Sequence, residues 1–262
     1  MPSTFTHYRF AQEVLKTLPN SAADIINAAP ELYYTGAHGP DILFYYKGLK
    51  RNPVNTQGLD MHNSPAEPFF LSAKKTISES RRPEAALAYI LGFITHFALD
   101  SSCHPYVYGR IEESGISHSE IEVEFDRELM EKQGLDPVRY DPTSHIKPTP
   151  ALAEVIAPFF SLPPETVEKS LRYMKKYNRL LVAPCFLKRA GICLILKISG
   201  NYKDYRGLMV NYKPNPRCRE SNDELMRLFN QSIPLAARLI TEYAAEFDKD
   251  VPLDPVYKKT YE

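Results

Sequence analysis

The amino-acid sequence predicts an all-α fold, and three features support this prediction. Apolar residues recur at helical spacing through much of the chain, most clearly in EAALAYILGFITHFALD, residues 84–100. Proline and glycine stand where helices should begin and end. No segment shows the sustained apolar/polar alternation that is typical of a sheet. The 262 residues, 44% hydrophobic and 24% charged, have a globular composition, and we expect a single domain spanning residues 1–262.

The first half of the chain should contain the longest helices. Residues 10–29 are expected to form one or two helices and residues 64–75 another, with the Gly- and Pro-rich segment 36–60 between them as a loop with a short helical turn. The strongest helix begins at Pro83, because proline is favoured in a first turn. It should end at His104, because the following Pro105 disfavours helical backbone in the preceding residue.

The second half should be helical as well. After a loop to about Ser117, a helix is expected from Ser117 or Ser119 to Gly134, since serine caps helix starts and glycine suits helix ends. A proline-rich link follows, and Pro234 should kink the last helix. The segment 185–200, CFLKRAGICLILKISG, combines apolar residues with cations, so it could be a buried helix or could touch a membrane surface; we favour the buried helix. The remaining helices are expected at residues 151–160, 164–181 and 222–247.

Charge and composition exclude some functions. The chain has 32 basic and 32 acidic residues, so stable binding of duplex nucleic acid is not expected. No apolar run reaches the roughly 20 residues of a transmembrane helix, and the N-terminal residues lack the apolar core of a secretory signal. We therefore expect a cytoplasmic protein without a transmembrane segment. The four cysteines form no CxxC pair and should be reduced, with Cys103 as a small buried thiol.

A pattern of histidines and carboxylates indicates metal chemistry. His96, Asp100 and His104 are spaced by four, which places them along one face of a helix. His118 and Glu122 form a second such pair on the next helix. Taken singly, these pairs are more often core hydrogen bonds or surface contacts. Because Asp100 follows a strongly apolar helix and a buried charge needs a partner or a metal, the joint pattern favours a site for several metal ions.

Five motifs occur in order along residues 4–126: THYRF, HGPDI, MHNSP, GFITHFALDSSCHPY and SHSEIEVEFD. Together they resemble the zinc-dependent phospholipase C family, which is related to single-strand-specific zinc nucleases. The resemblance implies an all-helical fold with zinc ions at the bottom of a cleft. The C-terminal half matches only as generic helices.

The resemblance also implies ligand sets. One zinc would be held by Asp41, His62, His96 and Asp100, and a second by His104, His118 and Glu122. A third would use Asp100 as a bridge, together with His7 and the N-terminal residue. Secreted relatives begin with a tryptophan whose amine and carbonyl bind this metal, whereas this chain contains no tryptophan. His38 could replace the missing ligand or could only shape its loop, and two to three zinc ions are expected.

The implied activity is phosphodiester hydrolysis, in which metal-activated water attacks phosphorus. Asp41 is also a candidate catalytic base, although we assign it first as a ligand. Tyr45 and Tyr46 flank the Asp41 loop and could bind a choline-like cation or a nucleobase, or could belong to the core. The partner would be a phospholipid or a small nucleotide-like diester, with transient contact to a membrane surface. A nuclease or nucleotidase, or a non-catalytic zinc-binding helical protein, are the alternatives, and His145 is expected in an exposed loop.

Overall fold

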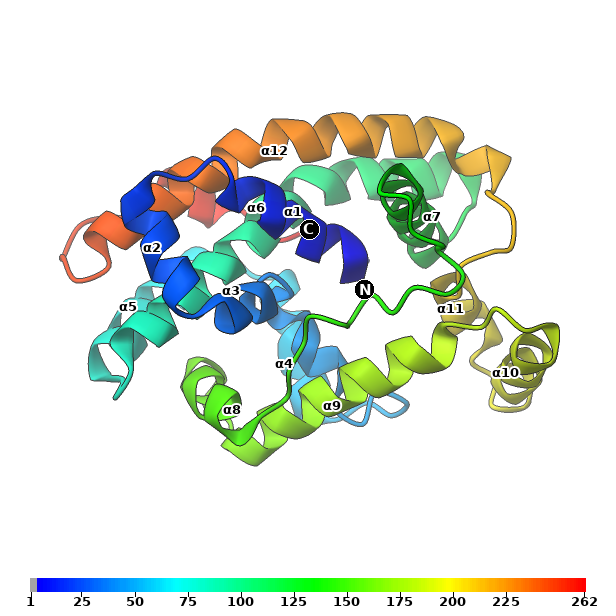
Figure 1. Ribbon diagram of the computed structural model, residues 1–262, viewed down its shortest axis with the longest axis horizontal. Helices are drawn as coiled ribbons and strands as arrows, with labels where there is room; N and C mark the ends of the chain where they lie inside the picture. The colour runs from blue at the N-terminus through cyan, green and yellow to red at the C-terminus, as the bar shows by residue number, and fades with distance from the viewer. Residues whose placement is uncertain (1–3) are drawn as a thin grey trace.

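The computed structural model describes residues 4–262, except for the side chains of residues 203 and 204, and no strand occurs in this range (Figure 1). The prediction of an all-α fold is confirmed; the single domain stays a prediction. The α-helices are α1 (Thr4–Leu15), α2 (Asn20–Ala28), α3 (Pro30–Gly36), α4 (Pro53–His62), α5 (Glu67–Glu79), α6 (Pro83–Ser114), α7 (His118–Lys132), α8 (Pro150–Ile156), α9 (Pro164–Leu181), α10 (Phe186–Ile198), α11 (Tyr202–Tyr205) and α12 (Arg219–Glu246). Five 3-10 helices join them: η1 (Gly39–Tyr45), η2 (Ala157–Phe160), η3 (Arg206–Leu208), η4 (Pro216–Cys218) and η5 (Pro255–Lys258).

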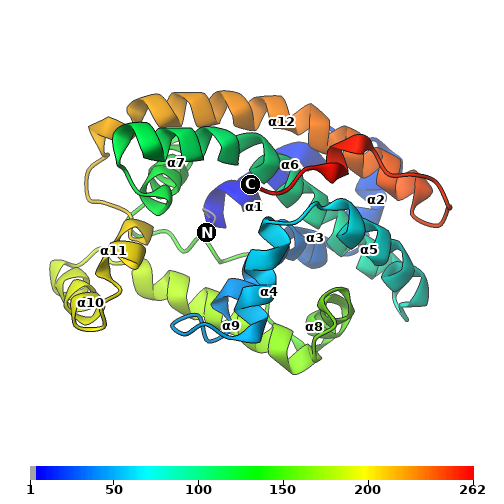
Figure 2. The ribbon, with the colours of Figure 1, turned by 180° about the vertical axis from the view of Figure 1, so that it is seen from behind.

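Helix α6 forms the centre of the molecule. Every residue from Ala85 to Asp100 is buried, as expected for a helix that is apolar on all sides. The helices α1, α3, α5 and α12 pack around it (Figures 1 and 2). By length and composition α6 could cross a membrane, but 83% of its most apolar window is buried inside the protein. We therefore interpret α6 as the core helix.

Two glycines bring α3 and α6 into backbone contact. A Cβ at Gly36 would lie 2.1 Å from the carbonyl oxygen of Tyr89, and one at Gly92 would lie 2.0 Å from that of Tyr33. No side chain larger than hydrogen fits at either position. This close crossing fixes the position of the segment that leaves α3, and that segment carries Asp41.

The prediction that the central helix ends at His104 is wrong. Helix α6 continues through Pro105 to Ser114 and ends at Gly115, which has the positive φ of 67° that glycine adopts readily. Proline inside a helix costs about 3 kcal/mol. Pro105 is exposed, and Cys103, His104 and Val107 on either side of it are buried, so tertiary packing offsets this cost. The expected loop shrinks to residues 115–117.

Three further comparisons between sequence and structure concern α4, α7 and α10. Helix α4 was not predicted, although Asn52 forms a capping box with Asn55 and Pro53 follows it. The prediction of a helix starting at Ser117 is confirmed, since the Ser117 hydroxyl accepts the Glu120 N–H. The prediction that segment 185–200 is a buried helix is wrong: α10 is a helix, but only Arg189 and Ile192 in it are buried.

Candidate metal centre

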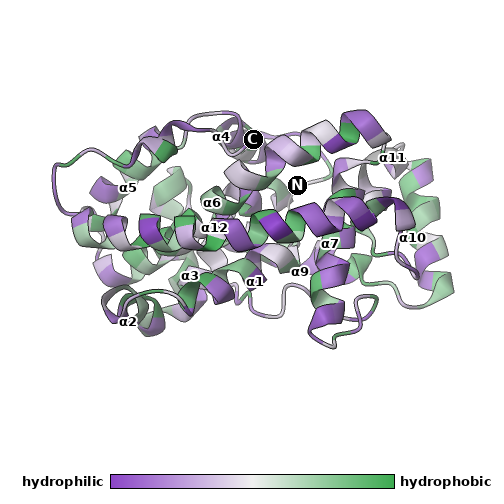
Figure 3. Cartoon of the chain, turned by 90° about the horizontal axis from the view of Figure 1, so that it is seen from above, coloured by the Kyte–Doolittle hydropathy of each residue, from purple (hydrophilic) through white to green (hydrophobic). Residues whose placement is uncertain are grey.

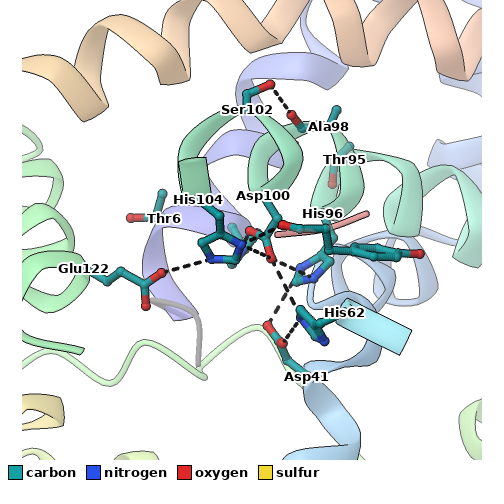
Figure 4. Close-up of polar contacts among 12 residues, drawn as sticks. Thr6, Asp41, His62, Thr95, His96, Ala98, Asp100, Ser102, His104 and Glu122 are labelled. Carbon is teal, nitrogen blue, oxygen red and sulfur yellow. Dashed lines mark hydrogen bonds and ion pairs between the residues drawn. The ribbon is translucent and has the colours of Figure 1, made fainter. Parts of the chain in front are cut away.

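Five elements bring histidine and carboxylate side chains together beside α6 (Figure 4). Among the described residues, three groups each place their ligand atoms within 4.8 Å of one another. The first is Asp41, His62 and His96; the second is His104, His118 and Glu122; the third is His7, His96 and Asp100. Each group has the nitrogen and oxygen donors that zinc accepts.

Asp100 lies between the groups. Its Oδ1 is 3.2 Å from His7 Nε2, and its Oδ2 is 3.1 Å from His96 Nε2. The same Oδ2 is 3.8 Å from His62 Nε2 and 3.9 Å from His104 Nδ1. The spacing of four residues along α6 therefore aligns His96, Asp100 and His104, as expected. One carboxylate contacts histidines from three helices, which is the arrangement that a bridging ligand needs.

The group around Asp41 is the most buried. Asp41 Oδ1 is 3.1 Å from His62 Nε2, and Oδ2 is 3.8 Å from His96 Nδ1. Asp41 and His96 are fully inaccessible to solvent, and His62 is 4% exposed. His96 belongs to two of the three groups, so those groups share one imidazole.

The second group lies at the exposed edge of the site. Glu122 Oε1 is 2.8 Å from His118 Nε2 and 3.5 Å from His104 Nε2. His118 is the one ligand candidate in these groups that is only half-buried, with 23% of its side chain exposed. Tyr108, whose ring lies 5.6 Å from that of His118, is also exposed. This edge is therefore the part of the three groups that solvent reaches most easily.

Two backbone carbonyls fix the orientation of ligand histidines. The Nδ1–H of His62 donates to the carbonyl of Gly58 at 2.8 Å, and that of His104 donates to the carbonyl of Tyr261 at 2.6 Å. A carbonyl can only accept, so each Nδ1 carries a proton and each Nε2 is directed towards the carboxylates of the site. Histidines that bind metal commonly have such an outer partner.

Several polar atoms of the site lie within ion-pair distance of one another but make no hydrogen bond. Both carboxylate oxygens of Asp41, both ring nitrogens of His96, Oδ2 of Asp100 and Oε2 of Glu122 are buried without a hydrogen bond. Buried polar atoms are nearly always satisfied, and each exception costs free energy. A bound cation would satisfy the carboxylate oxygens and the one nitrogen of His96 that has a lone pair, so the residues present fit zinc.

The charges in the cluster stabilise one another. Burial opposes ionisation of Asp100, but His96, His104 and His7 outweigh it and hold its pKa well below the usual range. Burial also opposes protonation of His104, yet Asp100 and Glu122 raise its pKa to about 9. Burial dominates at His96 and lowers its pKa to about 4. His96 is therefore neutral at pH 7 with a lone pair available.

Two neighbouring features position the ligands. Asp126 of α7 accepts the N–H groups of Phe5 and Thr6 at 3.2 and 2.7 Å, and the Thr6 hydroxyl at 2.6 Å. This carboxylate caps the N-terminal end of α1 from another helix and so places His7. Gly39 has a φ of 50°, and a Cβ there would lie 2.2 Å from the ring of His96. Only glycine lets the Asp41 segment lie against that ring.

His38 does not join any of the three groups. Its Nε2 lies 2.7 Å from Nε2 of His145, and the His145 ring stacks on Tyr8 with centroids 3.8 Å apart. The expectation that His145 is exposed is wrong, because the proline-rich link packs against α1 and brings this ring inward. Burial, and to a smaller extent the neighbouring His145, hold the pKa of His38 well below its ordinary value. The pair is therefore neutral, and its two rings share one hydrogen bond.

The remaining predicted residues lie near the site or beyond it. Tyr45 is buried, and its hydroxyl accepts a hydrogen bond from Asn178 at 3.2 Å. Tyr46 is partly exposed, with Lys47 Nζ 5.4 Å from its ring centroid. A substrate-binding role for either tyrosine stays a prediction. The N-terminal residue, expected as a ligand of the third zinc, lies outside the described residues. Cys103 is buried as predicted, and burial raises the pKa of its thiol.

The C-terminal tail is the part of the site that the sequence did not reveal. Besides accepting from His104, Tyr261 donates its N–H to the carbonyl of His62 at 3.2 Å. Its ring packs against His62 and His96 with centroids 5.5 and 5.8 Å apart. Backbone groups carry no signal in a sequence, so only the folded chain reveals this contact.

A comparison with family models identifies one match. The model described as zinc dependent phospholipase C matches residues 6–161, more than half of the chain. The matched range contains every candidate ligand from His7 to Glu122. Searches of curated proteins and of solved structures gave no match.

Proposed function

Because the chain belongs to the zinc-dependent phospholipase C family, we propose that it hydrolyses phosphodiesters with two to three zinc ions. The proposed ligands are those expected from the sequence. Asp41, His62, His96 and Asp100 would hold one ion, and His104, His118 and Glu122 a second. A third would be held by His7 with Asp100 as the bridge; the N-terminal residue expected there lies outside the described residues. The observation that carries the proposal is the set of three adjacent donor groups with buried, unpartnered lone pairs.

Different residues of the site would orient the ligands, accept a proton and admit the substrate. Zinc, when bound, lowers the pKa of water and offsets the negative charge of phosphate oxygens. Gly58 and Tyr261 hold the rings of His62 and His104 with Nε2 directed into the site. Asp41, buried beside His62 and His96, is a ligand first and a proton acceptor second. The half-buried His118 marks the edge at which a diester would enter.

We propose a phospholipid as the substrate. The family description supports this choice, and the exposed edge at His118 and Tyr108 suits a substrate held at a surface. A single-stranded nucleic acid or a nucleotide is the competing substrate, because zinc nucleases share this type of donor set. A non-catalytic zinc-binding protein would have the same ligands without turnover.

The test combines metal content with turnover. The purified protein is analysed for zinc per chain and assayed on phosphatidylcholine, on single-stranded DNA and on a soluble chromogenic phosphodiester. Asp100→Asn removes the charge of the bridge, whereas Asp24→Asn changes an exposed carboxylate on α2 and serves as the matched control. Circular dichroism verifies that both variants fold.

The proposal predicts two or three zinc ions and turnover of the chromogenic diester and of phosphatidylcholine. Asp100→Asn should lose at least one ion and most of the turnover, since several histidines lose their shared partner. Equal turnover by Asp100→Asn and wild type would refute the site. Turnover of DNA alone would replace the phospholipid, and bound zinc with no turnover would indicate a non-catalytic protein.

A further inference from the structure

Helix α10 exposes an apolar face at one end of the molecule (Figures 1 and 3). Leu187 is 77% exposed, Ile195 66% and Ile198 79%, and Leu194 is 59% exposed. Soluble surfaces carry scattered apolar side chains, but a contiguous apolar patch commonly marks an interaction site. In Figure 3, α10 lies at one end of the molecule and much of its ribbon has the hydrophobic colour.

Helix α10 is amphipathic in the way that is typical of helices lying at the surface of a bilayer. A helix turns roughly 100° per residue, which places Leu187, Leu194 and Ile198 along one line. Ile192, on the opposite side, packs with Ala183 and Met209 in a small cluster that fixes α10 to the protein. Lys188 and Lys197 lie roughly a quarter turn to either side of the apolar line. The Lys188 ammonium donates to the carbonyls of Arg179 and Val182 at 3.1 and 2.6 Å. The exposed Lys197 can extend to lipid headgroups while the apolar face enters the bilayer.

The sequence around α10 is rich in cations, of which Arg172 and Arg179 pair with Glu168 and Asp141. Residues 169–203 contain nine Lys and Arg residues and no Asp or Glu. A second exposed apolar residue, Leu49 at 66%, is flanked by Lys47, Lys50 and Arg51. This loop adjoins the segment after α10, because the Tyr205 hydroxyl donates to the carbonyl of Gly48 at 3.2 Å. The apolar face therefore lies in surroundings that attract anions.

We propose that the exposed face of α10 docks onto an anionic phospholipid surface. The choice of a lipid occupant rests partly on the proposed function, because a phospholipid hydrolase works at a bilayer. The flanking charges argue against a second copy of the chain. In a symmetric contact between two such faces, Lys197 of one copy would meet cations of the other, and α10 offers no carboxylate to pair with it.

The docking face is tied to the open edge of the metal centre. Asn211 and Asn215, which follow α10, donate to Glu124 and Glu120 of α7 at 3.0 and 2.9 Å. His118, the exposed ligand candidate, begins the same helix. Contact of α10 with a bilayer would therefore bring the edge at His118 near the lipid headgroups.

The test measures binding of the zinc-loaded protein to phosphatidylcholine vesicles with and without phosphatidylserine by co-sedimentation. The variant Leu194→Ser/Ile198→Ser removes two exposed apolar side chains, and Leu71→Ser removes one from the exposed surface of α5 as the matched control. Turnover of a soluble chromogenic phosphodiester is measured in parallel. Since the chain has no tryptophan, Ile195→Trp introduces a single fluorophore whose emission reports entry into the bilayer.

We expect wild type and Leu71→Ser to bind vesicles containing phosphatidylserine, with weaker binding at high salt. The α10 double variant should bind about 100-fold more weakly, about tenfold for each side chain, with unchanged soluble turnover. Tryptophan emission should shift to the blue. Equal binding by the double variant, or no binding by wild type, would overturn the proposal, and so would a dimer that this variant dissociates without any vesicle binding. Vesicle binding without turnover would sustain the docking surface and refute the proposed function.

Discussion

The C-terminal tail should control zinc affinity through a single carbonyl. A chain that ends at Thr260 loses the Tyr261 carbonyl that accepts the His104 Nδ1–H at 2.6 Å, and the Tyr261 N–H that donates to the carbonyl of His62. It also loses the Tyr261 ring, which is 1% exposed. Tyr261→Ala loses the ring but keeps both backbone groups, so the difference between the two variants reports on the backbone contacts.

The magnitude follows from the role of outer partners at metal sites. Removing the group that orients a ligand histidine typically lowers metal affinity by about 10- to 100-fold, or about 1.4–2.7 kcal/mol. Loss of the buried ring should destabilise both variants by about 3–5 kcal/mol. Zinc affinity should therefore fall further in the chain ending at Thr260 than in Tyr261→Ala, while their unfolding free energies without metal stay close.

The assay is competition for zinc against a chromophoric chelator, with urea unfolding of the metal-free proteins to measure stability. Both experiments use conditions under which circular dichroism shows that each variant is folded. Equal zinc affinity of the truncated chain and Tyr261→Ala would refute the reasoning, because the carbonyl would then have no role in orienting His104.

Three further predictions concern packing, capping and pH. Gly92→Ala should destabilise the protein by about 2 kcal/mol or more, because its Cβ meets the Tyr33 carbonyl, whereas Gly109→Ala on the same helix has no atom within 4 Å and should stabilise it slightly; thermal unfolding of the pair decides this. Asp126→Asn should cost about 2 kcal/mol in urea unfolding, since charged acceptors contribute more than neutral ones; an unchanged midpoint would contradict the capping role. Burial, then Lys175, lowers the pKa of His145 to about 3, so the unfolded chain, with a pKa near 6.5, takes up this proton first as pH falls. By pH 5, the unfolding free energy of wild type should therefore fall by about 2 kcal/mol, a loss that His145→Gln should not show. Parallel pH profiles of unfolding free energy for the two proteins would argue against a buried neutral His145.

The sequence was informative where one helix determines geometry. The spacing of His96, Asp100 and His104 follows from the helical repeat, and the structure aligns them along α6. Local rules failed where tertiary packing prevailed. The rule that proline ends a helix fails at Pro105, because the buried residues on both sides keep α6 helical to Ser114. The prediction of a buried helix for residues 185–200 is wrong, because hydrophobicity is readable in a sequence but the availability of a covering partner is not.

The C-terminal half, which matches the family motifs only as generic helices, contacts the proposed site directly. In α9, the Ser170 hydroxyl donates to the carbonyl of Ile42, next to Asp41. Further along the same helix, Asn178 donates to the hydroxyl of Tyr45 at 3.2 Å. These contacts hold η1 against α9.

These supporting contacts lie beyond residue 161, where the family match ends. The match therefore covers the candidate ligands from His7 to Glu122 but neither Ser170, which contacts the backbone next to Asp41, nor Tyr261, which orients His104. Orientation of an imidazole or a carboxylate depends on backbone carbonyls and hydroxyls that many sequences can supply. It follows that ligand residue types can be recognised from a motif, whereas the geometry that sets metal affinity must be read from the folded chain.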